Sequence, residues 1–219
     1  MDLSVIWLSI QIAVVSTILA ILVGVPIAWA LSRFQFKGHH VLSDLVLLPM
    51  LLPPTVLGYY LLQLLGRESF IGHIMEALFG FSIVFHWTGA AIAAFAVSVP
   101  FMIRAAEAGF SSVNRTYEEA AMTLGGSHVH IFLKITVPLA WKSVAAGIAV
   151  SFARALGEFG ATLMVAGNIP GKTKTMPIAI YEAVQTGRID EANTLTLTLS
   201  LIAIGLLLFI GFIARSKTN

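Results

Sequence analysis

The chain has 219 residues, of which 58% are hydrophobic and only 11% are charged, whereas ordinary soluble domains have roughly 45–50% apolar and about 25% charged residues. This composition leaves too little polar surface for a water-soluble fold and predicts an integral membrane protein. The net charge of +2 is spread along the chain, which argues against the concentrated basic surface that nucleic-acid binding requires. Because the sequence contains no cysteine, disulfides, thiol nucleophiles and thiolate metal sites are excluded.

Five apolar stretches are long enough to carry a helix across a hydrocarbon core about 30 Å thick. The second stretch is broken by Pro49, Pro53 and Pro54, and the fourth contains two charged residues. We therefore predict an all-α integral membrane protein with about five transmembrane helices. The five stretches cover approximately residues 5–31, 41–65, 82–103, 143–166 and 194–214.

The Lys and Arg residues of the connecting segments indicate the orientation, because cytoplasmic loops carry an excess of both. We expect a multi-pass protein of the plasma or inner membrane with an external N-terminus, a cytoplasmic C-terminus and a long cytoplasmic segment at about 104–142. No hydrophilic stretch is long enough for a second domain, so residues 1–219 are predicted to form one transmembrane domain. The set of segments assigned to the cytoplasm holds Arg33, Lys37, Arg104, Arg115, Lys134, Lys142, Arg215 and Lys217, and the external set holds Arg67, Lys172, Lys174 and Arg188.

The segment between the third and fourth stretches carries clear helix signals. Thr116 followed three residues later by Glu119 has the pattern of a capping box. Glu118 and Glu119 suit the positive end of a helix dipole. We predict a short helix that begins at Thr116 and stops at Gly125 or Gly126, because glycine readily adopts the left-handed conformation that ends helices.

A second short helix is expected directly after these glycines. Ser127 can cap it, and it should reach about Ile135. Pro138 would then suit the first turn of the fourth span. The result is a hairpin of two small helices between two spans, which composition alone would explain as a structural element at the membrane surface.

The spacing within this hairpin resembles the EAA loop of permeases of ATP-binding-cassette importers. Glu-Ala-Ala is followed after three residues by Gly125 and after nine more by Ile-x-Val-Pro, with Val137 where leucine is usual. The resemblance implies a coupling helix that docks into a groove on a separate ATPase subunit. Glu119 would hold the helix start and offer a charge to the partner, and Gly125 would make a turn where a side chain might clash. The ATPase-coupling candidates are Glu118, Glu119, Ala120, Ala121, Gly125, Ile135 and Pro138.

A nucleotide site is not expected in this chain. The run from Gly167 to Thr173 comes closest to the phosphate-binding loop, but it has three residues between its glycines instead of four and no helix-forming run after it. We expect that the chain is not an enzyme and holds no cofactor or metal, and that ATP and Mg²⁺ belong to a partner ATPase.

Two charges stand inside the fourth apolar stretch. Arg154 and Glu158 are four residues apart and would share one helical face. Charges at membrane depth are costly and usually face the protein interior or a watery cavity, so a structural ion pair and a pair that lines or gates a pathway both remain open. Gly157 and Gly160 beside this pair permit close helix approach, and the prolines of the second stretch can make a kink around a cavity. The pathway or gate candidates are Arg154, Gly157, Glu158, Gly160, Pro53 and Pro54.

Motifs spread over nearly the whole chain resemble molybdate permeases and, somewhat less, sulfate permeases. They are Leu-Gly-Glu-Phe-Gly-Ala at 156–161, Gly-Asn-Ile-Pro-Gly at 167–171, Arg-Phe-x-Phe-x-Gly at 33–38 and Leu-Pro-Pro-Thr-Val-x-Gly-Tyr at 52–59. The resemblance implies a type I importer permease that moves an oxyanion, molybdate or tungstate, by alternating access. It also implies a homodimer, two ATPase subunits and an extracytoplasmic substrate-binding protein.

The loop after the fourth stretch would face that binding protein or the arriving anion. Asn168, Lys172 and Lys174 are the candidates, and a solvated loop explains each of them equally well.

Two other classes of function compete with an importer subunit. An ion-coupled secondary transporter could use Arg154 and Glu158 as a proton relay, but it would not need the capped hairpin. A membrane-embedded enzyme would need polar groups that converge at one depth, and besides that pair only His86 and Gln63 are available. Purification distinguishes these classes, because an importer permease should bring down an ATPase subunit.

Overall fold

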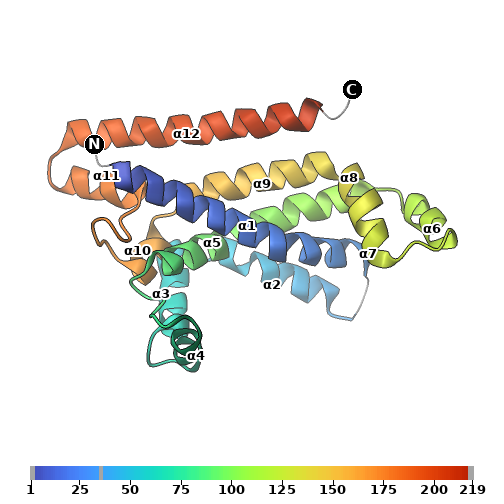
Figure 1. Ribbon diagram of the computed structural model, residues 1–219, viewed down its shortest axis with the longest axis horizontal. Coiled ribbons are helices and arrows are strands. Elements are labelled where there is room, and N and C mark those ends of the chain that lie inside the picture. Colours follow the sequence, from blue (N-terminus) through green and yellow to red (C-terminus); the bar gives the residue numbers. More distant parts are fainter. Residues whose placement is uncertain (1–2, 35–36, 217–219) are drawn as a thin grey trace.

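The computed structural model describes residues 3–34 and 37–216, and the regular structure in this part of the chain is entirely helical (Figure 1). The prediction of an all-α fold is therefore confirmed. Residues 35 and 36 of the 33–38 motif, and Lys217 of the orientation argument, lie outside the described residues. The helices are α1 (Leu3–Arg33), α2 (His39–Leu51), α3 (Pro54–Leu65), α4 (Phe70–Phe79), α5 (Trp87–Ser112), α6 (Arg115–Thr123), α7 (His128–Ile131), the π-helical turn η1 (Phe132–Thr136), α8 (Val137–Leu139), α9 (Trp141–Leu156), α10 (Gly160–Ala166), α11 (Met176–Gln185) and α12 (Ile189–Ser216).

Three described helices, α1, α5 and α12, are each long and apolar enough to cross a membrane. The number rises to five if each of two sharply bent helix pairs counts as one span. The short helices α4 and α11 lie in connecting segments where the sequence suggested none. α5 also continues nine residues beyond the predicted end of the third span at 103, and there Arg104 and Glu107 form an ion pair of 2.9 Å one turn apart.

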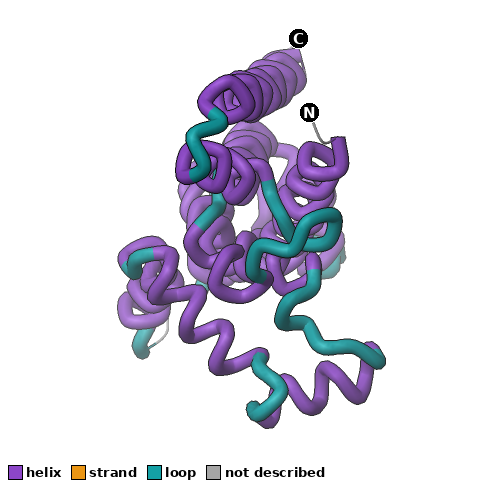
Figure 2. Tube along the Cα trace, turned by 90° about the vertical axis from the view of Figure 1, so that its left-hand side faces the viewer, coloured by secondary structure: helices purple, strands orange, loops and turns teal. Residues whose placement is uncertain are grey.

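The second predicted span is broken at its prolines. α2 and α3 are inclined by 106° to each other, and Leu52 between them is extended (φ −76°, ψ 141°) because a residue before proline is disfavoured in the helical region. Pro54 occupies the first turn of α3, where its missing N–H leaves no hydrogen bond unmade. α3 and α4 together form an arm beside the bundle, which is visible in the end-on view of Figure 2.

The fourth predicted span is broken as well. α9 ends at Leu156 and α10 begins only at Gly160. A second bend, of 79°, separates residues 128–139 from α9. The continuous helix expected over 143–166 was therefore wrong, because apolar composition sets the length of a span but does not show where its backbone turns.

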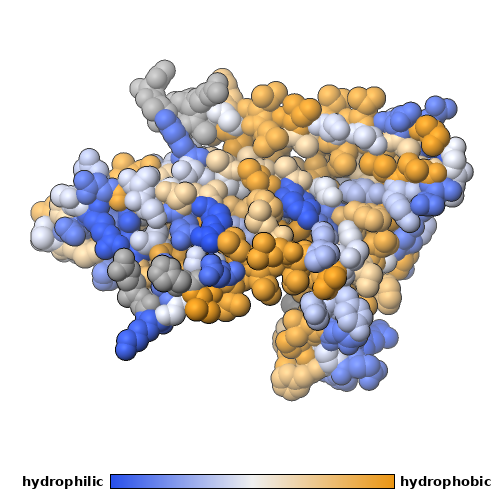
Figure 3. Space-filling model, turned by 180° about the vertical axis from the view of Figure 1, so that it is seen from behind, coloured by the Kyte–Doolittle hydropathy of each residue, from blue (hydrophilic) through white to orange (hydrophobic). Residues whose placement is uncertain are grey.

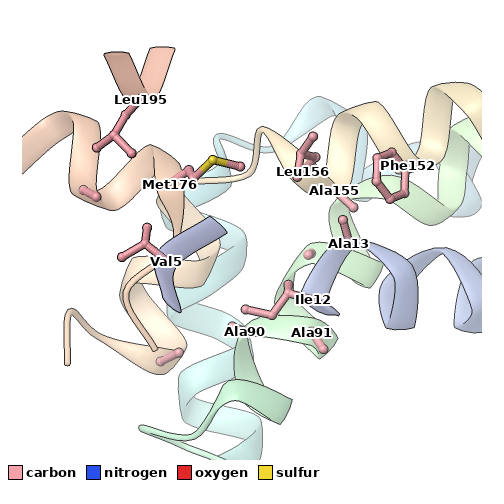
Figure 4. Packing of buried hydrophobic residues seen from close by; sticks show 13 residues of the cluster. Val5, Ile12, Ala13, Ala90, Ala91, Phe152, Ala155, Leu156, Met176 and Leu195 are labelled. Carbon is pink, nitrogen blue, oxygen red and sulfur yellow. The ribbon is translucent and has the colours of Figure 1, made fainter. Parts of the chain in front are cut away.

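α1, α5 and α9 form the centre of the bundle, with α1 packed against both of the others (Figure 1). Much of this interface is made by small side chains that let the helices approach closely. One cluster of buried residues joins both ends of the chain to this centre, and Figure 4 shows it. It includes Val5, Ile12, Ala13, Ala90, Ala91, Phe152, Ala155, Leu156, Met176 and Leu195.

α12 lies on the outside and contacts α9 and α11. None of the residues in its most apolar window is buried, and Leu201, Leu208 and Phe212 are all more than 60% exposed. Figure 3 shows hydrophobic side chains over the middle of the molecule and hydrophilic ones toward its two ends, the hairpin end among them. In water this surface would be strongly unfavourable, so the fold requires the lipid environment that the composition predicts.

The arm contacts the bundle where α3 crosses α10. A Cβ atom added to Gly58 would lie 2.7 Å from the Ala161 Cα atom and 2.8 Å from the Met164 Cβ atom. Both distances are shorter than van der Waals contact, so the two helices can cross here only because residue 58 has no side chain.

Replacement of Gly58 by alanine tests this crossing. We expect Gly58→Ala to lower the free energy of unfolding in detergent by about 1–3 kcal/mol, because a methyl group is forced into a filled space. Gly205→Ala in α12 is the matched control, since an added Cβ there meets no atom within 4 Å. Equal thermal stability of the two variants would contradict the crossing.

Candidate functional site

The hairpin formed by α6, α7 and η1 lies at one end of the bundle (Figure 1). α6 is capped by Asn114, whose Oδ1 atom accepts hydrogen bonds from the Thr116 backbone N–H (3.0 Å) and from the Thr116 hydroxyl (2.9 Å). Thr116 is thus inside the helix, and the predicted capping box of Thr116 and Glu119 was wrong. Asparagine two positions earlier is itself among the best N-cap residues and takes that role.

The glycines after α6 end it as predicted. Gly125 has a φ of +83°, its N–H donates to the Met122 carbonyl (2.9 Å), and the Gly126 N–H donates to the Ala121 carbonyl (3.0 Å). A Cβ atom added to Gly125 would meet nothing within 4 Å in this chain. The requirement for glycine is therefore conformational rather than steric within the chain.

The second half of the hairpin starts and extends as predicted, although its middle is a π-helical turn. The Ser127 hydroxyl accepts a hydrogen bond from the His130 N–H (3.3 Å). The helix of residues 128–139 continues from α7 through η1, which contains Ile135, into α8, where Pro138 lies in the last turn before the bend to α9. The expectation of Pro138 in the first turn of the fourth span was wrong. Because Pro138 has no N–H to donate to the carbonyl of residue 134, the regular i→i−4 hydrogen bonding of an α-helix is interrupted around it.

The carboxylate that holds the hairpin belongs to Glu118, which is 7% exposed, whereas Glu119 is exposed. The Oε1 atom of Glu118 accepts hydrogen bonds from Arg33 Nη2 (2.9 Å), Arg33 Nε (3.2 Å) and the Thr136 hydroxyl (2.6 Å). The structural role assigned to Glu119 from the sequence is thus filled by Asn114 and Glu118. Sequence reasoning did not select Arg33 or Thr136 as site residues; Arg33 was noticed only in the orientation argument and within the 33–38 motif.

The outer surface of the hairpin combines apolar and charged side chains. Leu124 is 89% exposed, and Tyr117, Val129 and Met122 are also exposed. Ala120 and Glu119 are exposed on the same helix as Tyr117. Large apolar side chains exposed beside charges, on a polar segment outside the spans, are typical of a protein–protein contact.

Arg154 and Glu158 form the predicted ion pair, but not on one helix. Their Nη1 and Oε2 atoms are 2.8 Å apart, and the Glu158 side chain is only 1% exposed. The Oε1 atom of Glu158 accepts a hydrogen bond from the Ala161 N–H in the first turn of α10 (2.8 Å). Glu158 therefore bridges the break between α9 and α10, which is a structural role, while the Arg154 side chain stays 29% exposed.

The breaks of the second and fourth spans lie against each other. A Cβ atom added to Gly160 would lie 3.2 Å from the Pro54 Cβ atom and 3.1 Å from the Thr55 Cγ2 atom. Pro53 is the N-cap of the same helix as Pro54. Gly157 is exposed at the end of α9. The structure thus brings Pro54 and Gly160, which are far apart in sequence, to one crossing of α3 and α10, two residues after Glu158.

The loop before α11 is held by Glu182. Its carboxylate accepts a hydrogen bond from Asn168 Nδ2 (2.7 Å) and pairs with Lys174 Nζ (2.8 Å) and Arg188 Nη2 (3.2 Å). The hydrogen bond from Asn168 and then that from Lys174 lower the pKa of Glu182 to about 2. Asn168 and Lys174 are therefore engaged within the chain by Glu182, and Asn168 and Lys172 are exposed while Lys174 is half-buried.

The groups considered for an enzyme site make only local hydrogen bonds. Gln63 donates to the Tyr59 hydroxyl one turn away (3.1 Å), and His86 Nδ1 lies 2.9 Å from the Thr88 hydroxyl. Within residues 3–34 and 37–216, no group of three His, Cys, Asp or Glu side chains is placed to hold a metal ion.

Comparison with known proteins gives agreement over almost the whole chain. The family described as "Binding-protein-dependent transport system inner membrane component" matches residues 5–216. A putative molybdenum transport system permease protein, YvgM of Bacillus subtilis, is 42% identical over 97% of this chain and 92% of its own length. The molybdenum transport system permease protein ModB of Escherichia coli K12 is 38% identical over 97% of this chain and 94% of its own.

A probable sulfate transport system permease protein, cysT of Chlorella vulgaris, is 35% identical over 93% of this chain and 76% of its own length. Among solved structures, a chain of the MetNI methionine ABC transporter in an inward-facing conformation superposes with a TM-score of 0.71 at 18% identity, covering 98% of this chain and 95% of that chain. At this identity the structural likeness shows a common fold.

The cap of α6 can be tested by substitution at its two rival positions. We expect Asn114→Ala to weaken α6 by about 1 kcal/mol, since it removes the N-cap acceptor, and Thr116→Val to weaken it less. Amide hydrogen exchange of residues 115–123 measures both effects. If Thr116→Val is the more damaging change, the helix is capped by Thr116 after all.

The Glu182 cluster predicts a pH dependence. Because the pKa of Glu182 is lowered to about 2, the stabilisation it provides is complete above the pKa of about 4.5 in the unfolded chain and is lost as pH falls toward about 2. We expect hydrogen exchange in loop 167–175 to keep the same protection from about pH 7 to about pH 5, and Glu182→Gln to reduce that protection throughout. Loss of protection in the wild type between these values would contradict the cluster.

Proposed function

This chain belongs to the inner-membrane components of binding-protein-dependent transport systems, and on that premise we propose that it is the membrane-spanning permease subunit of an ATP-driven molybdate importer. Curated relatives named as molybdenum permeases, similar over nearly their full length, support the substrate. Sulfate is the second candidate because a relative named as a sulfate permease also matches, at lower identity. Tungstate has the same charge and shape as molybdate, so the chain is expected to accept both.

The observation that carries this proposal is the hairpin. It is capped at both helix starts, it is fixed to α1 through a buried carboxylate, and its outer surface exposes Leu124, Tyr117 and Val129. A rigid element that joins two spans can transmit a rigid-body motion into the membrane, whereas a flexible loop would absorb the motion. A secondary transporter has no use for such an element.

The proposed assembly contains two copies of this chain, two ATPase subunits and an extracytoplasmic binding protein. ATP and Mg²⁺ are held by the ATPase subunits, which contact the hairpins from the cytoplasm. The N-terminus is then external and the C-terminus cytoplasmic, in agreement with the distribution of Lys and Arg. Lys172, exposed in the loop before α11, faces the binding protein or the arriving anion.

The proposed mechanism is alternating access. Approach of the ATPase subunits on ATP binding moves the hairpins, and α9 carries this motion to the break at Glu158. There α10 packs on α3 of the second span, so both breaks shift together and open the pathway toward the loaded binding protein. Arg154 keeps part of its side chain exposed and can offer positive charge to a passing dianion.

Uptake of labelled molybdate by vesicles that hold the whole complex tests this function. Uptake should require ATP and the binding protein. We expect Gly125→Val to reduce molybdate uptake per ATP hydrolysed by about tenfold or more, because a β-branched residue is strained at a φ of +83° and distorts the hairpin.

The matched control is Gly187→Val between α11 and α12. This glycine has a φ of +73° and equally open surroundings, so it imposes the same backbone demand outside the hairpin. Its variant should keep the wild-type ratio of uptake to hydrolysis. Equal ratios in both variants would contradict the coupling role, and uptake without the ATPase subunits would contradict the importer itself.

A further inference from the structure

Arg33 and Glu118 are 85 residues apart in the chain, yet they form one of its least exposed ion pairs, with side chains 9% and 10% exposed. We propose that Arg33, Glu118 and Thr136, here called the clasp, are positioning residues that fasten the hairpin to α1, so that α1 moves with α5 and α9 when the hairpin is pushed. This inference rests on the proposed function, because it assigns residues to the coupling step of that importer.

The clasp joins separate elements at a single oxygen atom. Arg33 at the end of α1, Glu118 in α6 and Thr136 in η1 meet at Glu118 Oε1, through contacts of 2.9, 3.2 and 2.6 Å. Arg33 Nη2 also donates to the Val113 carbonyl at the end of α5 (3.3 Å). Both halves of the hairpin and the ends of two spans are thus held by one charged cluster.

Aromatic packing supports the same connection one turn earlier in α1. The Trp29 ring lies 5.2 Å from the Phe132 ring of η1, measured between centroids, and Phe132 lies 5.8 Å from Phe110 of α5. Phe110 is fully buried. α1 therefore contacts the second half of the hairpin through two adjacent turns, one aromatic and one charged.

The need for a clasp follows from how the spans are connected. The chain runs from α5 through the hairpin into α9, so a push on the hairpin reaches both of these helices through the backbone. α1 has no such connection and packs on α5 largely through small side chains, which include Ala13, Ala91 and Ala94. The small side chains allow close approach but interlock little, and larger ones such as Leu31, Met102 and Phe110 pack together only toward the hairpin, where the clasp lies.

Position 33 requires both the charge of arginine and the arrangement of its hydrogen-bond donors. Two of its nitrogen atoms contact the same carboxylate oxygen while Nη2 also reaches the Val113 carbonyl. A lysine carries the charge but not this planar arrangement of donors. Arg33→Lys should therefore restore only part of the function lost in Arg33→Gln.

The test uses vesicles that contain the complete complex with its ATPase subunits and binding protein. We expect Arg33→Gln and Glu118→Gln each to lower molybdate uptake per ATP hydrolysed by about fivefold or more, while the ATPase subunits still co-purify and hydrolyse ATP. The matched control is Glu76→Gln, which removes the charge from an exposed ion pair with Arg67 in the arm. It should leave the uptake ratio unchanged.

A cross-link separates positioning from folding. Phe34 and His128 line one hollow of about 190 Å³ between α1 and the hairpin. Because the sequence has no cysteine, Phe34→Cys and His128→Cys introduce a single pair of thiols. A cleavable thiol cross-linker between them can replace the clasp. In the Glu118→Gln background it should restore the uptake ratio, and cleavage should abolish the gain. If the clasp residues served only to stabilise the folded chain, the uptake ratio would not rise with the cross-link and fall again on its cleavage.

Three results would overturn the inference: a wild-type uptake ratio in both clasp variants, loss of the ATPase subunits from both variants, or no rescue by the cross-linker. If the wild-type complex itself takes up no molybdate on addition of ATP, the proposed function fails and the inference falls with it. If the wild type is active and the clasp variants couple normally, only the inference fails.

Discussion

A charged or hydrogen-bonding group that the hydrocarbon region or the protein itself shields from water must find its partner within the protein. This constraint shapes the two most irregular parts of the chain. Where the fourth span breaks, Glu158 satisfies both Arg154 and an N–H at the start of α10. Where the spans meet the polar hairpin, Glu118 satisfies Arg33 and Thr136. Each carboxylate fixes the backbone geometry around it.

These two fixed points lie at opposite ends of α9. One end follows the hairpin after a bend of 79°, and the other leads through Glu158 into α10, which packs on α3. Displacement of the hairpin therefore has a continuous, well-packed route to the crossing of the two broken spans. The fold places the hairpin and a point of close helix crossing at the two ends of α9, which is the arrangement that the proposed coupling requires.

Much of this arrangement could be predicted from the sequence. Apolar length gives the spans, Gly125 gives the end of α6 and Ser127 the start of α7, because these signals act over a few residues. The break between α9 and α10 was missed. Pro53 and Pro54 did mark an interruption of the second span, but since a proline can end a helix or merely kink it, they could not show the bend of 106°. Glu118 was ranked below Glu119 because the choice between them depends on Arg33, 85 residues away in the chain. No local pattern contains that information.

The most direct test of the central claim, that the hairpin is a lever pushed by a separate ATP-hydrolysing subunit, is side-specific labelling at its tip. Because the chain has no cysteine, Leu124→Cys provides a single thiol at a highly exposed position. A membrane-impermeant thiol reagent should label it in inverted vesicles but not in intact cells, and bound ATPase subunits should protect it. Labelling from outside the cell, or equal labelling with and without the ATPase subunits, would contradict the account.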